Sequence, residues 1–254
     1  MLFPTLTFAV FFALVLPISW ALRPHRRRWQ WFMIAVSYLF YGWWDARFVA
    51  LVALSAAANV AFGHRIAAAE GRRRRAWLWL AVGANLALLG WFKYYGFFAT
   101  ELNVALRAMG AEGGLRLLDI ALPVGISFFT FHAISYVVDI ARGQLAPVGF
   151  ADYAVYAAFF PHLVAGPIVR AAEFLPQLVA PRPLRRADVT RAGWLIAGGL
   201  FKKTVVSTFV AAAIVDPVFS VPDRYGSLDV LLAIYGYAVQ IYADFSAYTD
   251  IAIG

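Results

Sequence analysis

The sequence RRRRAWLWLAVGANLALLGWF, residues 72–92, decides the class of fold. Four arginines are followed by a run, residues 76–92, that contains no charged side chain. As a helix rising about 1.5 Å per residue, this run nearly crosses a hydrocarbon core of about 30 Å. The arginines at its beginning suit the headgroup region, where long basic side chains keep their charge in water. The stretch therefore predicts a transmembrane helix with one basic end.

The rest of the chain repeats this pattern. Other long apolar runs lie at residues 2–22, 29–44, 48–64, 120–138, 192–215 and 229–250. The chain is 63% hydrophobic and only 14% charged, and its mean hydropathy is +0.71, whereas soluble domains are about one quarter charged. The runs are continuous and do not alternate in polarity, which favours helices over membrane strands. We predict an all-α, polytopic transmembrane helical bundle.

Loop charges orient the predicted spans, because cytoplasmic loops carry an excess of Lys and Arg. The first loop contains Arg23, Arg26, Arg27 and Arg28, and the loop after the third run contains Arg65 and the arginines of residues 72–75. Both loops are inside if the N-terminus is outside. The segment 96–119 is nearly balanced in charge and is then outside, with residues 101–109 as a candidate interfacial helix.

The apolar run at residues 153–169 conflicts with this rule if it crosses the membrane completely. A full crossing would place the basic stretch that follows, including Arg170, Arg185 and Arg186, outside. We therefore predict that residues 153–178 form a re-entrant hairpin, broken near Pro161, Gly166, Pro167 and Pro176. Broken backbone at membrane depth is tolerated where it is buried in protein or lines a wet cavity. The prediction is a single membrane domain, residues 1–254, of about seven spans plus one hairpin.

Composition excludes several other classes of function. The formal net charge is +8, but the basic residues form short clusters between apolar runs, so no nucleic-acid partner is predicted. There is no cysteine, which excludes disulfides and thiolate metal sites. No metal site is predicted. Residues 1–22 have neither a basic n-region nor a small-residue cleavage site, so a removable signal peptide is not expected.

Several ionisable residues fall inside the apolar runs, where they usually serve a function. Lys202 and Lys203 lie midway along residues 193–215. Either they face the interior of the bundle, or the helix begins near Lys202 and both side chains snorkel to the headgroups. Asp244 and Tyr248 share one helix face because they are four residues apart. Asp244 either lines a polar strip or pairs with a basic residue of a neighbouring helix.

Histidine is a natural general base near neutral pH. His132 lies deep in the run 120–138, and His162 lies in the predicted hairpin. A buried histidine is more often a hydrogen-bonded structural residue than a catalyst. No motif of a soluble enzyme, such as a nucleophile elbow, a phosphate loop or a His-Glu-x-x-His pair, occurs in the chain. The residues alone leave both a transporter and an enzyme open.

Several segments together resemble the membrane-bound O-acyltransferase family. They are MLFP at 1–4, SYLFYGWW at 37–44, KYY at 93–95, LPVGISFFTF at 122–131, SYVVD at 135–139, FFPHLVAGPI at 159–168, GLFKK at 199–203 and DFSAYTDIAIG at 244–254. Their order and spacing make the match specific. The resemblance covers the whole chain but only about the N-terminal half of the family pattern.

The resemblance implies an enzyme that moves an acyl group, acetyl in the bacterial branch, to hydroxyls of an exported polysaccharide such as alginate. The donor would be acetyl-CoA or an acyl carrier on the cytoplasmic side, with no bound cofactor. The setting would be the bacterial inner membrane, with periplasmic partner proteins. The family's catalytic histidine is expected beyond Gly254, so no catalytic residue is assigned.

The resemblance also implies a tunnel through which the acyl group passes. The candidates for its wall are His132, His162, Arg170, Lys202, Lys203, Asp244 and Tyr248. Two alternatives stay open: a membrane transporter or channel, and a non-catalytic membrane scaffold for a partner acyltransferase.

Overall fold

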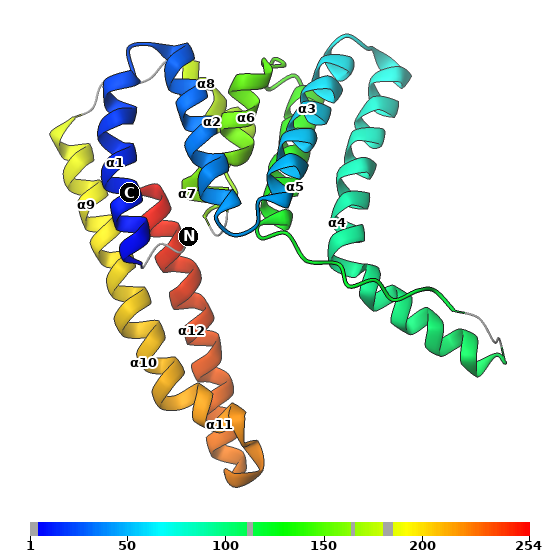
Figure 1. Ribbon diagram of the computed structural model, residues 1–254, viewed down its shortest axis with the longest axis vertical. Helices are drawn as coiled ribbons and strands as arrows, with labels where there is room; N and C mark the ends of the chain where they lie inside the picture. Colours follow the sequence, from blue (N-terminus) through cyan, green and yellow to red (C-terminus); the bar gives the residue numbers. More distant parts are fainter. Residues whose placement is uncertain (1–4, 111–113, 164–165, 180–184) are drawn as a thin grey trace. The chain divides into compact units, whose positions relative to one another are not determined.

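The computed structural model describes residues 5–110, 114–163, 166–179 and 185–254 (Figure 1). Across these ranges the chain forms helices and their connections, and no strand occurs in them. The prediction of an all-α protein is therefore confirmed. The MLFP segment, Val164, Ala165 and Arg182 lie outside the described residues.

Four helical stretches are long and apolar enough to cross a membrane. They are α3 (Arg47–Ala67), α4 (Gly71–Ala108), the stretch Arg186–Ser220 and α12 (Ser227–Ile253). Two shorter apolar helices are α1 (Leu6–Leu22) and α5 (Ile126–Ala141). Helix α2 covers Arg26–Gly42. By length and composition, these helices support a membrane protein.

The chain divides into two compact units. The first unit consists of the described parts of Met1–Trp44, Phe159–Pro167 and Ala180–Gly254, and the second of Asp45–Ala158 and Ile168–Val179. Each unit is described by itself below.

In the first unit, a long helical rod runs beside α12 (Figure 1). Its parts are α9 (Arg186–Phe201), the π-helical η1 (Lys202–Ser207), α10 (Thr208–Val210), the π-helical η2 (Ala211–Val215) and α11 (Asp216–Ser220), and the 3₁₀ turn η3 (Pro222–Arg224) follows. Small residues allow the close approach. A Cβ atom at Gly199 would lie 2.7 Å from Cγ1 of Ile251 and 2.8 Å from the carbonyl oxygen of Ala247.

Aromatic rings hold the remaining helices of the first unit together. The ring of Phe160, in the short helix α7 (Phe160–Leu163), lies 5.3 Å from that of Phe11 and 5.6 Å from that of Phe40. The backbone N–H of Phe160 also donates to the Ser37 hydroxyl at 3.3 Å. Edge and tilted ring contacts of this kind add to the gain from burying apolar area. They fix α7 against α1 and α2.

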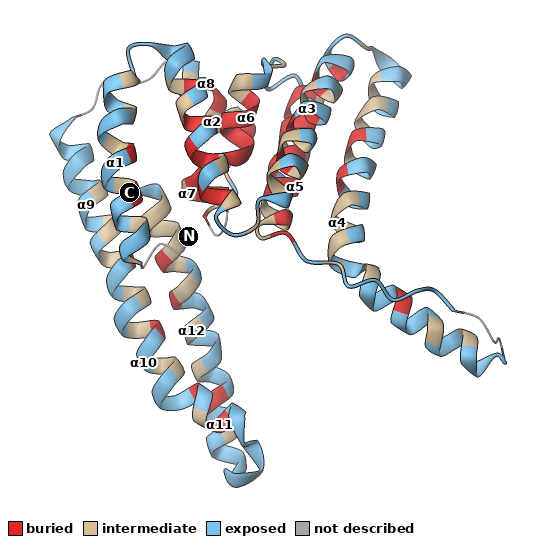
Figure 2. Cartoon of the chain, in the orientation of Figure 1, coloured by how far each residue is buried: buried red, intermediate tan, exposed pale blue. Residues whose placement is uncertain are grey.

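The core of the second unit surrounds the short helix α6 (Phe150–Ala158), in which every residue from Tyr153 to Ala158 is buried (Figure 2). Helices α3, α5 and α8 (Ala171–Val179) contact α6. The rings of Tyr136 and Tyr153 lie 4.5 Å apart at its centre. By contrast, α4 has few buried residues, as expected for a helix whose outer surface faces lipid (Figure 2).

Replacing Gly63 with alanine is expected to destabilise the second unit by about 1 to 3 kcal/mol, as overpacking does. A Cβ atom there would lie 2.8 Å from the Tyr136 ring and 2.9 Å from Cδ1 of Ile140. The control is Gly83→Ala in α4, where nothing lies within 4 Å of a new Cβ atom. Thermal unfolding in detergent should show a lower melting temperature for Gly63→Ala than for the wild type, and no decrease for Gly83→Ala. Equal melting temperatures would contradict the tight contact.

The helices differ from the predicted runs in two places. Helix α5 begins at Ile126 and not at residue 120, because Pro123 and Gly125, which has a φ of 74°, break the chain before it. Helix α4 continues through Ala108, so residues 101–109 form no separate helix; the lower part of α4 changes direction instead (Figure 1).

The predicted hairpin, residues 153–178, consists of short helices, none longer than α6 or α8 with 9 residues each. Breaks fall at Phe159 and over residues 166–170, the second of which Gly166 and Pro167 predict. Pro176 does not break the chain, because it lies inside α8.

Candidate functional site

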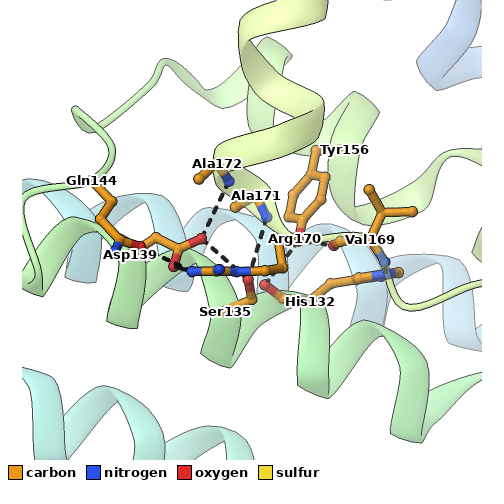
Figure 3. A network of polar contacts seen from close by, with 9 residues as sticks. All are labelled: His132, Ser135, Asp139, Gln144, Tyr156, Val169, Arg170, Ala171 and Ala172. Carbon is orange, nitrogen blue, oxygen red and sulfur yellow. Dashed lines mark hydrogen bonds and ion pairs between the residues drawn. The ribbon is translucent and has the colours of Figure 1, made fainter.

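A network of polar contacts joins α5 to the beginning of α8 in the second unit (Figure 3). His132, Ser135 and Asp139 share one face of α5, since they are three and four residues apart. Backbone N–H groups of the facing segment donate to them: Val169 to His132 Nε2 at 3.3 Å, Ala171 to Ser135 Oγ at 3.3 Å and Ala172 to Asp139 Oδ2 at 3.2 Å. The first N–H groups of a helix have no partner within it, so α5 caps α8. We call this the α5–α8 network.

Arg170 is the cation of the α5–α8 network. Its Nη2 donates to Asp139 Oδ1 at 2.7 Å and to Gln144 Oε1 at 2.9 Å. The Asp139 side chain is only 2% exposed, whereas the Arg170 side chain is 49% exposed. A buried carboxylate therefore holds one corner of a guanidinium whose remainder reaches the surface of this unit.

His132 is fully buried, and its imidazole has a defined role in the network. Because Nε2 accepts a hydrogen bond, the ring in this arrangement is neutral and carries its proton on Nδ1. The Tyr156 hydroxyl donates to the carbonyl oxygens of Val169 and His132, at 2.9 Å and 3.3 Å. His132 therefore acts here as a hydrogen-bonded structural residue that holds the backbone of Val169. A structural role is also the commoner one for a buried histidine, compared with a catalytic role.

A second polar cluster joins the rod to α12 in the first unit. Lys202 Nζ donates to Asp250 Oδ2 at 2.5 Å and to Ser246 Oγ at 2.7 Å. Lys203 Nζ donates to Asp244 Oδ1 at 2.7 Å and lies 5.7 Å from the centre of the Tyr248 ring. Each lysine thus binds a pair of α12 residues four apart. We call this the lysine–aspartate cluster.

The structure shows where the helix that carries Lys202 and Lys203 begins. The helix begins at Arg186, well before Lys202, so the interpretation that the helix starts near the lysines is wrong. Asp244 does pair with a basic residue of the neighbouring helix. Both lysines lie in the π-helical segment η1, and such segments occur often at functional sites. Ala243 and Ala247 are the buried residues of α12 here, and the ion pairs flank them.

His162 belongs to neither cluster. It is buried in α7, with its ring 5.4 Å from that of Phe159. Gly166 approaches it so closely that a Cβ atom would lie 2.4 Å from the His162 Cα, which requires glycine there. The structure thus places His132 and Arg170 together in the second unit, and Lys202, Lys203, Asp244 and Tyr248 together in the first.

Several members of these clusters escaped the sequence analysis. Ser135 and Asp139 entered only through the family resemblance, although their spacing from His132 was a usable signal. Gln144 gave no signal. A buried amide pair between α3 and α4 was also missed: Asn85 Nδ2 donates to Asn59 Oδ1 at 2.8 Å, and Asn59 Nδ2 donates back at 3.2 Å. Such reciprocal pairs fix helices together where water is absent.

Acidic and histidine side chains do not gather in the described ranges in groups of three or more that could hold a metal ion. The contacts of the two clusters suit two roles: binding of an anion by a guanidinium, and compensation of charges inside an apolar bundle.

No family model matches the chain. Individual proteins do. The probable alginate O-acetylase AlgI of Azotobacter vinelandii is 36% identical over 252 residues, which is 96% of this chain and 49% of the relative. The protein of the same name from Pseudomonas putida is 36% identical over 225 residues, 87% of this chain and 46% of the relative. The peptidoglycan O-acetyltransferase of Helicobacter pylori is 30% identical over 250 residues, 87% of this chain and 46% of the relative.

The chain therefore spans about half the length of the curated relatives that it matches. Over that shared half, the chain is similar to proteins named alginate O-acetylase and peptidoglycan O-acetyltransferase, and this similarity is consistent with its resemblance to the membrane-bound O-acyltransferase family.

Proposed function

We propose that this chain forms part of a membrane-bound O-acetyltransferase that acts on hydroxyls of an exported polysaccharide such as alginate. The observation that carries the proposal is the 36% identity over 96% of the chain to a relative named probable alginate O-acetylase. The acetyl donor is acetyl-CoA or an acyl carrier on the cytoplasmic side, used as a substrate. Periplasmic proteins that handle the polysaccharide are the expected partners.

The proposed setting is the bacterial inner membrane, with the N-terminus outside and about seven spans plus the re-entrant hairpin. The basic loops after the first and third runs support this orientation. The short helices α6, α7 and α8 suit a hairpin that enters and leaves on one face. In this arrangement, the residues proposed to line the acyl path are His132, His162, Arg170, Lys202, Lys203, Asp244 and Tyr248.

Single cysteines test the topology. The chain contains no cysteine, so each variant adds one thiol to it. We expect Arg116→Cys to react with a membrane-impermeant maleimide in intact spheroplasts, and Arg72→Cys and Arg185→Cys to react only after permeabilisation. Reaction of Arg185→Cys in intact spheroplasts would overturn the hairpin, because residue 185 would then follow a complete crossing.

Deletion and complementation test the activity. The gene that encodes this chain is deleted, and the ester-bound acetate of the exported polysaccharide is measured by alkaline release. We expect acetate to be lost and to return with the full reading frame. If acetate returns when every histidine encoded after codon 254 is replaced, the protein is a scaffold for another acyltransferase. Unchanged acetate, with altered solute uptake into vesicles, would favour the transporter.

A further inference from the structure

We propose that Arg170 binds a phosphate group of the acyl donor, and that Asp139 and Gln144 position its guanidinium for this task. The inference rests on the proposed acetyl transfer. The ligand chemistry is a phosphate carried by coenzyme A or by a phosphopantetheine arm, since either donor presents one.

The geometry of Arg170 leaves donors for a ligand. A guanidinium has five N–H donors in a planar fork. Its contacts to the described residues use Nη2 alone, which donates to Asp139 and Gln144. The N–H groups on Nε and Nη1 have no hydrogen-bond partner within the described parts of the chain. With its side chain 49% exposed, Arg170 can bind an anion through two of these donors, as arginine does with phosphate.

The α5–α8 network holds this guanidinium still. Asp139 is itself fixed by the N–H of Ala172 and by the Ser135 hydroxyl, which donates at 3.4 Å. The backbone on either side of Arg170 is held as well, because Val169 and Ala171 donate to α5 side chains. A side chain already ordered in the free protein loses less entropy when it binds. An arginine needed only for packing would not require both a buried carboxylate partner, here Asp139, and a guanidinium whose other N–H groups are exposed.

The charge around Arg170 also favours an anion. Arg142 ends α5 one turn beyond Asp139, and Arg74 Nη2 donates to the Ile140 carbonyl oxygen at 2.7 Å. Three arginines therefore gather at the C-terminal end of α5, where positive potential attracts phosphate. The opposing charges are Asp139, which pairs with Arg170, and Glu173, one turn along α8. Under the proposed topology this end of α5 faces the cytoplasm, where the donor is found.

Donors with and without phosphate test the proposal on the purified full-length protein. The three probes are acetyl-CoA, S-acetyl-4′-phosphopantetheine and S-acetylpantetheine, of which the last has no phosphate. We expect Arg170→Ala to raise KM for a phosphate-bearing donor by about tenfold to a hundredfold, the usual range for a hydrogen bond to a charged group. KM for S-acetylpantetheine should not change. An effect on acetyl-CoA alone assigns the nucleotide phosphates, and an effect on both assigns the 4′-phosphate.

The matched control is Arg73→Gln, which removes one exposed positive charge from α4 but breaks no contact described for the α5–α8 network. It should change KM by less than about threefold, since an exposed charge acts only at long range. Gln144→Ala leaves the Asp139 contact in place and should give a smaller rise in KM than Arg170→Ala. Equal changes in all three donors for Arg170→Ala would overturn the proposal and leave Arg170 a packing residue.

A binding measurement separates this inference from the proposed function. If the wild-type protein transfers acetyl from no donor, the function is wrong, and equilibrium binding of coenzyme A still tests Arg170. If Arg170→Ala does not give a monodisperse protein, Arg170→Lys is used instead. It keeps one charge but not the planar fork, so it should bind coenzyme A more weakly than the wild type. If Arg170→Lys and the wild type bind coenzyme A with equal affinity, the planar guanidinium of Arg170 does not bind the phosphate as proposed.

Discussion

Replacing Lys203 with methionine is expected to destabilise the pairing of the rod with α12 by about 3 kcal/mol, the cost of an uncompensated charge at the centre of a membrane helix. Asp244 would keep its hydrogen bond from Ser207 but lose the cation that neutralises it. Methionine has nearly the same length as lysine and fills the same space. Unfolding of the purified protein in mixed detergent micelles measures the loss.

A double-mutant cycle shows whether the loss comes from the ion pair. The variant that combines Lys203→Met with Asp244→Leu removes both charges and should recover most of the stability, because replacing a whole pair by apolar residues is often neutral. Thr204→Val serves as a control next to Lys203, since Thr204 bonds only the Leu200 carbonyl of its own helix. If the losses in the free energy of unfolding of the two single variants add up in the double variant, there is no coupling energy between Lys203 and Asp244.

Replacing Asp139 with alanine is expected to destabilise the second unit by about 1 to 3 kcal/mol, the cost of leaving buried hydrogen-bond donors without their acceptor. Arg170, the Ala172 N–H and the Ser135 hydroxyl all donate to this carboxylate. The Asp139 side chain is almost inaccessible to solvent, so water cannot replace it without rearrangement. Thermal unfolding in detergent measures the global effect.

Limited proteolysis measures the local effect of the same change. Trypsin cleaves after arginine, and loss of the Asp139 carboxylate should loosen the backbone around Arg170 and speed cleavage there. Asp139→Asn is the matched control, because it keeps the shape and one acceptor oxygen and should lose less stability. Cleavage after Arg170 at the wild-type rate in Asp139→Ala would show that this carboxylate does not hold the beginning of α8.

Most of the architecture could be predicted from the sequence because it depends on hydropathy along the chain. Continuous apolar runs must form helices in a bilayer, since every backbone polar group needs a partner within the segment. The weaker predictions were helix ends. The run 76–92 was ended at Lys93, yet α4 continues through Ala108, because a helix needs only its own backbone hydrogen bonds and tolerates charged side chains outside the hydrocarbon.

The sequence singles out several candidate residues but does not show which of them are partners. A charge inside an apolar run stands out in any sequence, which is how Lys202, Lys203 and Asp244 were found. Asp139 was not found in this way, because it lies near the end of its run and looks like an ordinary loop charge. Its importance is visible only once the backbone of residues 169–172 lies beside α5.

The sequence by itself determined that this protein is an all-helical membrane protein with charges inside its apolar runs, because the period and polarity of the side chains specify helices and their lipid-facing surfaces. Only the tertiary structure decided which charges meet. Lys203 pairs with Asp244 across 41 positions, and Arg170 pairs with Asp139 across 31. A helical period tells which face a residue occupies but not which helix lies against that face, and that choice depends on how all the helices pack together.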